Sequence, residues 1–149
     1  MSQTKLAFVA SQDETALQAK SELENKYPHV PENQADVVVV LGGDGKMLEA
    51  LRYYIDKPVK VFGMNKGTVG FLMNEFSSDN LLKRIEAATL VTLHPLRMHV
   101  ETSTGIVKEA LAFNEVSLLR ETSQTAKLRI TIDGTCLLYT SPSPRDTEV

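Results

Sequence analysis

The sequence has no tryptophan, a single cysteine and no extended run of basic or apolar residues. One cysteine, Cys136, excludes an intramolecular disulfide and is typical of a reducing compartment. Without a basic run there is no electrostatic footprint for nucleic acid, and no apolar run approaches the roughly 20 residues of a membrane-spanning helix. The first residues also lack the basic-then-apolar pattern of a secretion signal. We therefore expect a cytoplasmic protein with no nucleic-acid or membrane partner.

The remaining composition is that of a globular protein, with 149 residues, 42% hydrophobic and 23% charged, and a net charge of −3. Apolar runs and helical periods alternate along the first ninety or so residues. The expected elements are a strand at 6–10, a helix from Ser11 that Pro28 and Pro31 end, a strand at 37–41, a helix over 47–55, a strand at 59–62, and a helix capped by Ser78 or Asp79. This alternation predicts the α/β class, with a Rossmann-like parallel sheet.

The period changes from about Thr92 onward. Apolar residues then alternate with polar ones, first around Met98 and Val100 and again around Ile130 and Ile132. Such alternation is typical of antiparallel strands with one buried face. We therefore expect an α/β nucleotide-binding domain at 1–95 and the first strands of an incomplete β-rich domain at 96–134. Residues 135–149 carry prolines at alternate positions and no sustained period, which predicts a non-native, disordered tail.

The most informative stretch is the turn Gly42-Gly43-Asp44-Gly45, which follows the apolar run Val37–Leu41 and precedes an amphipathic helix. In such a strand–turn–helix junction, backbone N–H groups can face a phosphate. The turn is neither a P-loop nor a dinucleotide-binding fingerprint, because the glycines are wrongly spaced for both. Our hypothesis is that it holds a phosphate donor or acceptor and that Asp44 does chemistry there. The alternative is a tight turn with a helix-capping aspartate.

A second glycine-bearing loop, 63–70, follows the next predicted strand. Ligands bind beyond the carboxyl ends of strands in open α/β sheets, so the two loops are expected to line one crevice. Asn65 could bond a ribose or phosphate there, and Phe71 could pack on a base or fill the core. Taken alone, this loop is more simply explained as structural.

Two polar residues, Asn114 and Glu115, interrupt an otherwise apolar stretch. They are costly to bury unless they are paired. One interpretation is that they hydrogen-bond to the hydroxyls of a ribose or to the amine of an adenine. The alternative is that they lie at an exposed strand end or in a bulge. The three histidines, His29, His94 and His99, lie in no cluster with metal-ligand spacing, so we expect no protein-held metal site.

Three segments resemble those of the bacterial NAD kinases in order and spacing: 35–45, 63–72 and 112–119. The resemblance implies ATP-dependent phosphorylation of the 2′-hydroxyl of the adenosine ribose of NAD, which gives NADP. It implies that Asp44 is the proton acceptor, that magnesium or another divalent cation accompanies ATP, and that the parent enzyme is a homo-oligomer. The ligand-binding residues that it implies are Gly42, Gly43, Asp44, Gly45, Asn65, Gly67, Gly70, Phe71, Asn114 and Glu115.

The sequence departs from that family after Gly134, where the family continues with a second Asp-Gly pair and a Thr-Pro-x-Gly-Ser-Thr-Ala-Tyr segment. From Thr135 this chain differs, so we expect a truncated form with little or no kinase activity and a tendency to aggregate. Two alternatives stay open. A lipid kinase of the diacylglycerol type shares the Gly-Gly-Asp-Gly turn, and a non-catalytic fragment would bind nucleotide without turnover. The 65–72 loop and the Asn114-Glu115 pair favour NAD kinase over the lipid kinase.

Overall fold

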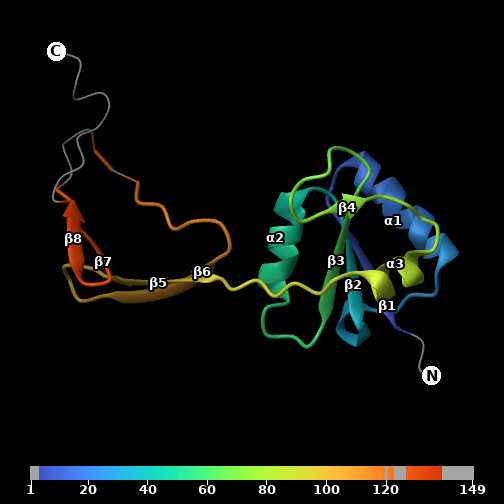
Figure 1. Cartoon of the computed structure of the whole chain (residues 1–149), viewed down its shortest axis with the longest axis horizontal. Coiled ribbons are helices and arrows are strands. Elements are labelled where there is room, and N and C mark those ends of the chain that lie inside the picture. Colours follow the sequence, from blue (N-terminus) through green and yellow to red (C-terminus); the bar gives the residue numbers. More distant parts are fainter. Residues whose placement is uncertain (1–3, 120, 123–126, 139–149) are drawn as a thin grey trace, which may run out of the picture. The chain divides into compact units, whose positions relative to one another are not determined.

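A parallel four-stranded sheet forms the first part of the chain (Figure 1). The computed structural model describes residues 4–119, 121–122 and 127–138. The strands lie in the order β1 (Leu6–Ala10), β2 (Val37–Leu41), β3 (Lys60–Asn65) and β4 (Asn74–Glu75). Because β2 is central and consists of four valines and a leucine, it pairs on both edges and is buried on both faces. The predicted α/β fold with a parallel sheet is confirmed.

Helices cover both faces of this sheet (Figure 1). The helices α1 (Glu14–Lys26) and α3 (Leu81–Ala87) pack on one face, and α2 (Asp44–Tyr53) packs on the other. A short 3-10 helix, Glu32–Gln34, leads into β2. The chain therefore leaves the neighbouring strands β1 and β2 toward opposite faces. Such a divergence opens a crevice beyond the strand ends, where ligands bind in α/β sheets.

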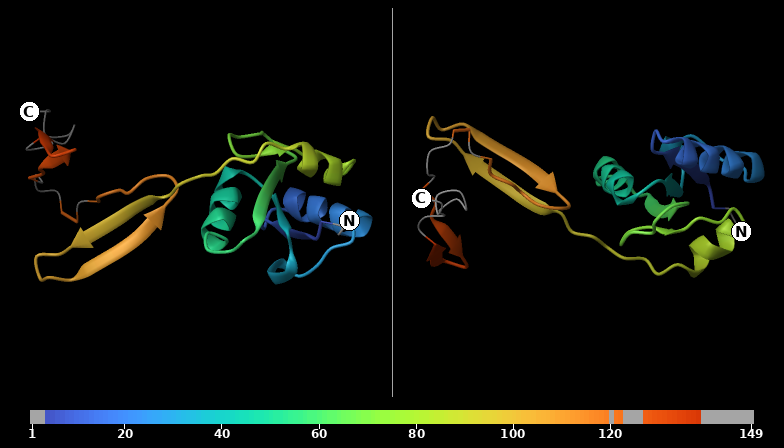
Figure 2. Two further views of the ribbon diagram at one scale, coloured as in Figure 1. Left: turned by 60° about the horizontal axis from the view of Figure 1, so that its bottom comes forward. Right: turned by 90° about the horizontal axis from the view of Figure 1, so that it is seen from above.

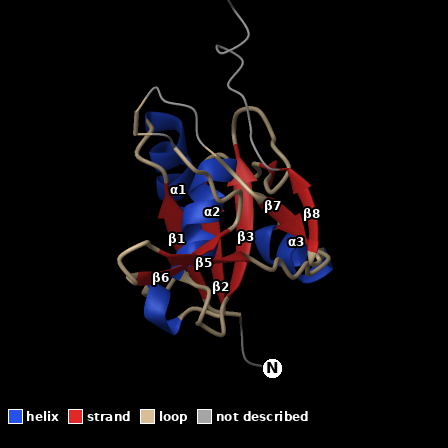
Figure 3. Ribbon diagram, turned by 90° about the vertical axis from the view of Figure 1, so that its left-hand side faces the viewer, coloured by secondary structure: helices blue, strands red, loops and turns tan. Residues whose placement is uncertain are grey.

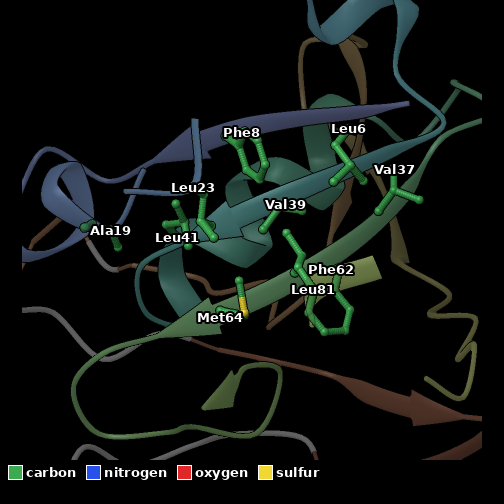
Figure 4. Packing of buried hydrophobic residues seen from close by; sticks show 11 residues of the cluster. Leu6, Phe8, Ala19, Leu23, Val37, Val39, Leu41, Phe62, Met64 and Leu81 are labelled. Carbon is green, nitrogen blue, oxygen red and sulfur yellow. The ribbon is translucent and has the colours of Figure 1, made fainter. Parts of the chain in front are cut away.

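Alternate residues of each strand build two separate cores. Figure 4 shows the larger one, in which side chains from β1, β2 and β3 meet Ala19 and Leu23 of α1 and Leu81 of α3. The opposite face buries Val38 and Val40 under Met47 and Ala50 of α2. The carboxyl end of β2 is thus fixed from both sides, which places the turn that follows it.

Several element boundaries differ from those expected, among them α2, which spans Asp44–Tyr53 and not 47–55. The α1 N-cap is Asp13, not Ser11, because the Asp13 carboxylate accepts the Ala16 N–H at 2.9 Å. Asn80, in a left-handed conformation, precedes α3 and makes no side-chain cap, so neither Ser78 nor Asp79 caps it. The strand β3 continues to Asn65, and the two-residue β4 was not predicted because it is too short to show a period.

Two antiparallel hairpins follow, as the alternating pattern predicted. One pairs β5 (Leu96–Glu101) with β6 (Val107–Ala112), drawn in gold in Figure 2. The other pairs β7 (Ile130–Ile132) with β8 (Thr135–Leu138), labelled in Figure 3. The chain divides into two compact units between Asn114 and Glu115. The domain bounds 1–95 and 96–134 remain a prediction. Among the described residues, no helix is long and apolar enough to cross a membrane.

The strand β8 begins at Thr135, the residue at which the sequence predicted the start of a disordered tail. Asp133 and Gly134 have φ values of 48° and 80°, and two consecutive positive φ values are typical of a type I′ turn. An Asp-Gly pair favours this turn, which joins hairpin strands of matching twist. It returns Thr135 to lie opposite Ile132. Residues 139–149, the rest of the predicted tail, lie outside the described residues.

Candidate functional site

The glycine turn after β2 lies against the ends of both neighbouring strands. The Gly42 N–H donates to the Met64 carbonyl of β3 at 3.1 Å, and a Cβ on Gly42 would meet the Ser11 Oγ, just beyond β1, at 2.8 Å. Gly42 also has a φ of +148°, which L side chains rarely adopt. Two independent constraints therefore require glycine at this position.

Replacing Gly42 with alanine is expected to destabilise the fold by about 1–3 kcal/mol, because the new methyl group adds backbone strain and meets Ser11. Chemical denaturation measures the loss. The matched control is Gly43→Ala at the next position, where the backbone is extended and an added Cβ meets nothing within 4 Å. The free energy of unfolding of the Gly43→Ala chain should stay within about 0.5 kcal/mol of that of the original chain. Equal losses in the two variants would contradict the steric argument.

Asp44 is the first residue of α2, and backbone donors from the loop after β3 hold its side chain. The Phe71 N–H donates to Oδ2 at 3.0 Å, and the Leu72 N–H donates to Oδ1 at 3.1 Å. The positive end of the α2 dipole lies at the same place and favours a negative charge there. Each carboxylate oxygen has a second lone pair, which can accept a further hydrogen bond from a ligand. The two predicted loops therefore do meet, and they meet at Asp44.

The other glycines of the turn have no packing reason to be glycine. A Cβ on Gly43 or Gly45 would meet no atom within 4 Å, and both residues are exposed. The first turn of a helix leaves backbone N–H groups without intrahelical partners. A site that combines open space, free N–H groups and a helix N-terminus suits a phosphate. The predicted phosphate contacts of Gly43 and Gly45 remain predictions with this support.

Asn65 and Phe71 have different positions in the second loop. The Asn65 Nδ2 donates to the Thr68 carbonyl at 2.7 Å, and its Oδ1 accepts the Gly67 N–H at 3.2 Å. Asn65 thus shapes the loop, and a ligand contact from it remains a prediction. The Phe71 side chain is fully exposed, which excludes the core-filling alternative. The Phe71 backbone N–H contacts Asp44, and the exposed ring of the same residue is available to stack on a base.

The predicted pair Asn114 and Glu115 follows β6, and both residues are exposed. This exposure agrees with their reading as an exposed strand end. The two residues fall on opposite sides of the boundary between the compact units. Their part in ligand binding therefore remains a prediction.

Sequence reasoning missed two contributors to this site. One is the loop after β1, where Ser11 lies beside Gly42 and its hydroxyl donates to Asp13. Hydrogen bonds from the Ser11 hydroxyl and the Ala16 N–H hold the pKa of Asp13 below its usual range. The rule that neighbouring strand ends share a crevice could have found Ser11. The other contributor is the pair of backbone donors at Phe71 and Leu72, which side-chain patterns cannot reveal.

In the part of the chain that the structure describes, no three His, Cys, Asp or Glu side chains gather in a way that could hold a metal ion. Lys46, in the first turn of α2, is half-buried and pairs with Glu49 at 3.0 Å. Within the Gly42–Gly45 turn, Asp44 is the acidic residue. Its carboxylate could therefore contact a ligand, or a metal ion that the ligand brings with it.

Comparison with known proteins identifies the relatives of this chain. A family model described as the ATP-NAD kinase N-terminal domain matches residues 1–92. The chain is 51% identical over 134 residues to an NAD kinase of Hyphomonas neptunium, covering 90% of this chain and 52% of the relative. It is 50% identical over 136 residues to one of Brucella suis, covering 90% and 53%, and 51% identical over 131 residues to one of Caulobacter vibrioides, covering 88% and 50%. The chain thus spans about half the length of the curated relatives it matches.

Proposed function

Because the chain belongs to the ATP-NAD kinase family, we propose that it is the nucleotide-binding part of an enzyme that phosphorylates NAD. The proposed reaction transfers the γ-phosphoryl group of ATP to the 2′-hydroxyl of the adenosine ribose and gives NADP and ADP. The supporting observation is the Asp44 carboxylate, which two backbone N–H groups hold at a glycine-rich turn. The proposal rests on a chain about half as long as its relatives.

In the proposed reaction, Asp44 accepts the proton of the 2′-hydroxyl as the hydroxyl oxygen bonds to the γ-phosphorus. The bond from that phosphorus to the β,γ-bridging oxygen breaks, and ADP leaves with the electron pair. A ribose hydroxyl is a weak nucleophile, so a carboxylate within hydrogen-bond reach and an in-line arrangement both lower the barrier. The N-terminus of α2 would stabilise the charge on the transferred group.

Asp44 is the residue of the turn that would help to hold a magnesium ion brought by ATP. Magnesium is usually held by one or two carboxylates together with substrate phosphates, and Asp44 is a carboxylate of this kind. When bound, such an ion would neutralise part of the charge on the transferred phosphoryl group. ATP as donor, a divalent cation, a cytoplasmic location and a homo-oligomeric parent enzyme all belong to the proposal.

Phe71 provides a test of substrate binding that is separate from the chemistry. Replacing Phe71 with alanine should weaken NAD binding about 5- to 150-fold, because stacking on an aromatic ring contributes about 1–3 kcal/mol per base. Stability should not change, since the ring is exposed. Calorimetry with NAD and a denaturation curve measure the two effects. Leu90→Ala, also at an exposed position, is the control. Unchanged NAD affinity in the Phe71 variant would exclude stacking.

The proposed function is tested first by binding, which can be measured whether or not turnover occurs. Calorimetry should show weak binding of NAD and of ATP with magnesium, and no binding to vesicles that contain diacylglycerol. Incubation with both nucleotides, followed by an assay for NADP, measures any turnover. Binding without NADP formation would support a non-catalytic nucleotide-binding fragment. Affinity for the lipid and not for NAD would support the lipid kinase alternative.

A further inference from the structure

We propose that Gly70 is a positioning residue for Asp44, an inference that rests on the proposed role of Asp44 as the base. The sequence reading assigned Gly70 to the ligand-binding residues. The geometry points to a different task. Gly70 leaves room for the carboxylate, so that the next two backbone N–H groups can hold both of its oxygens.

The contact between Gly70 and Asp44 is closer than any side chain would allow. A Cβ built on Gly70 would lie 2.3 Å from Oδ2, 2.6 Å from Cγ and 2.6 Å from Oδ1 of Asp44. Real Cβ atoms essentially never come within 3.0 Å of such neighbours. Its three nearest neighbours all belong to the one carboxylate. Asp44 is therefore the group that excludes a side chain from position 70.

The backbone conformation does not by itself require glycine at this position. The described glycines with positive φ are Gly42, Gly105 and Gly134, and Gly70 is not among them. An L-residue can adopt a negative φ without the strain that applies at Gly42. The reason for glycine at position 70 is therefore the contact with the Asp44 carboxylate and not the backbone conformation.

The resulting clamp fixes the plane of the carboxylate. The bonds from the Phe71 and Leu72 N–H groups, at 3.0 and 3.1 Å, reach one oxygen each. Two such bonds restrain rotation of the carboxylate about its Cβ–Cγ bond and direct the remaining lone pairs. A catalytic base needs this kind of orientation toward the hydroxyl that it deprotonates. The clamp also ties the loop after β3 to the turn after β2.

A methyl group at position 70 should displace the carboxylate and leave the sheet intact. The atoms that it would meet are the end of one short side chain, and that side chain can rotate away. Rotation breaks the two clamp bonds. In the Asp44→Ala chain the carboxylate atoms that the methyl group would meet are absent. The effect of Gly70→Ala should therefore depend on whether Asp44 is present.

A double-mutant cycle tests this dependence. The variants are Gly70→Ala, Asp44→Ala and the pair together, with Gly67→Ala as the control, since a Cβ there lies 3.8 Å from its nearest neighbour. Gly70→Ala should raise the unfolding equilibrium constant about tenfold in the original chain and change it less than about twofold in the Asp44→Ala chain. Amide exchange at Phe71 and Leu72 should become about tenfold faster in Gly70→Ala and stay unchanged in Gly67→Ala.

Equal destabilisation by Gly70→Ala in both backgrounds, or unchanged exchange at Phe71 and Leu72, would overturn the proposal. If Gly70→Ala alone fails to fold, the double variant decides, because it should fold when Asp44 is the cause and should fail otherwise. These measurements contain no nucleotide. They can therefore fail while the kinase proposal stands, and NAD binding to the unaltered chain tests that proposal separately.

Discussion

Replacing Asp44 with asparagine is expected to lower kcat for NADP formation by about 100- to 10,000-fold in any form of the chain that turns over ATP and NAD. Asparagine has nearly the same shape, but its amide cannot take up the proton of the 2′-hydroxyl. Its NH₂ group would also face one of the two N–H donors that now bond to the carboxylate. A coupled assay for NADP measures the rate.

Calorimetry with NAD separates the chemical role of Asp44 from a role in binding. If Asp44 is the base, the Asp44→Asn chain keeps its affinity for NAD while turnover is lost. Loss of the affinity itself would make Asp44 a ligand anchor or a structural residue. Asp56→Asn makes the same chemical change at an exposed position beyond α2 and should leave both the rate and the affinity unchanged.

Leu23→Ala should produce the largest loss of stability among the changes considered, about 2–5 kcal/mol. The Leu23 side chain is 0% exposed and packs in the larger core with Leu6 and Phe8 of β1. Truncation leaves a cavity under α1 that the surrounding strands can close only in part. The free energy of unfolding from chemical denaturation measures the cost.

Leu17→Ala is the matched control, because it makes the same truncation in the same helix at a position that is 45% exposed. Its effect should be below about 1 kcal/mol. A loss at Leu17 as large as the loss at Leu23 would mean that α1 packs differently from the core described for it. In the Leu23 variant, NAD binding should be lost only to the extent that the chain is unfolded, because Leu23 belongs to the core and not to the turn.

Local patterns predicted the elements with strong periods. The run Val37–Leu41 was identified as a doubly buried strand because five consecutive apolar residues exclude a solvent-facing side. The turn after it was identified because Gly42, Gly43 and Gly45 separate that run from an amphipathic helix, a junction at which backbone N–H groups can face a phosphate. Weak or competing signals failed. Ser11 matched a capping box, yet the neighbouring Asp13 makes the cap, and the Asp133-Gly134 turn was overlooked beside a proline-rich tail.

The family, the parallel sheet and the position of Asp44 just after the central strand could all be predicted from the sequence. These follow from local composition and from motifs that lie close together in the chain. Which glycines serve the fold and which face open space became visible only once distant parts of the chain were brought together. Gly42 and Gly70 are excluded from bearing side chains by Ser11 and Asp44, residues distant in sequence, whereas Gly43 and Gly45 meet nothing. The donors that hold Asp44 are likewise backbone N–H groups, which every non-proline residue carries, so only folding shows which of them reach it.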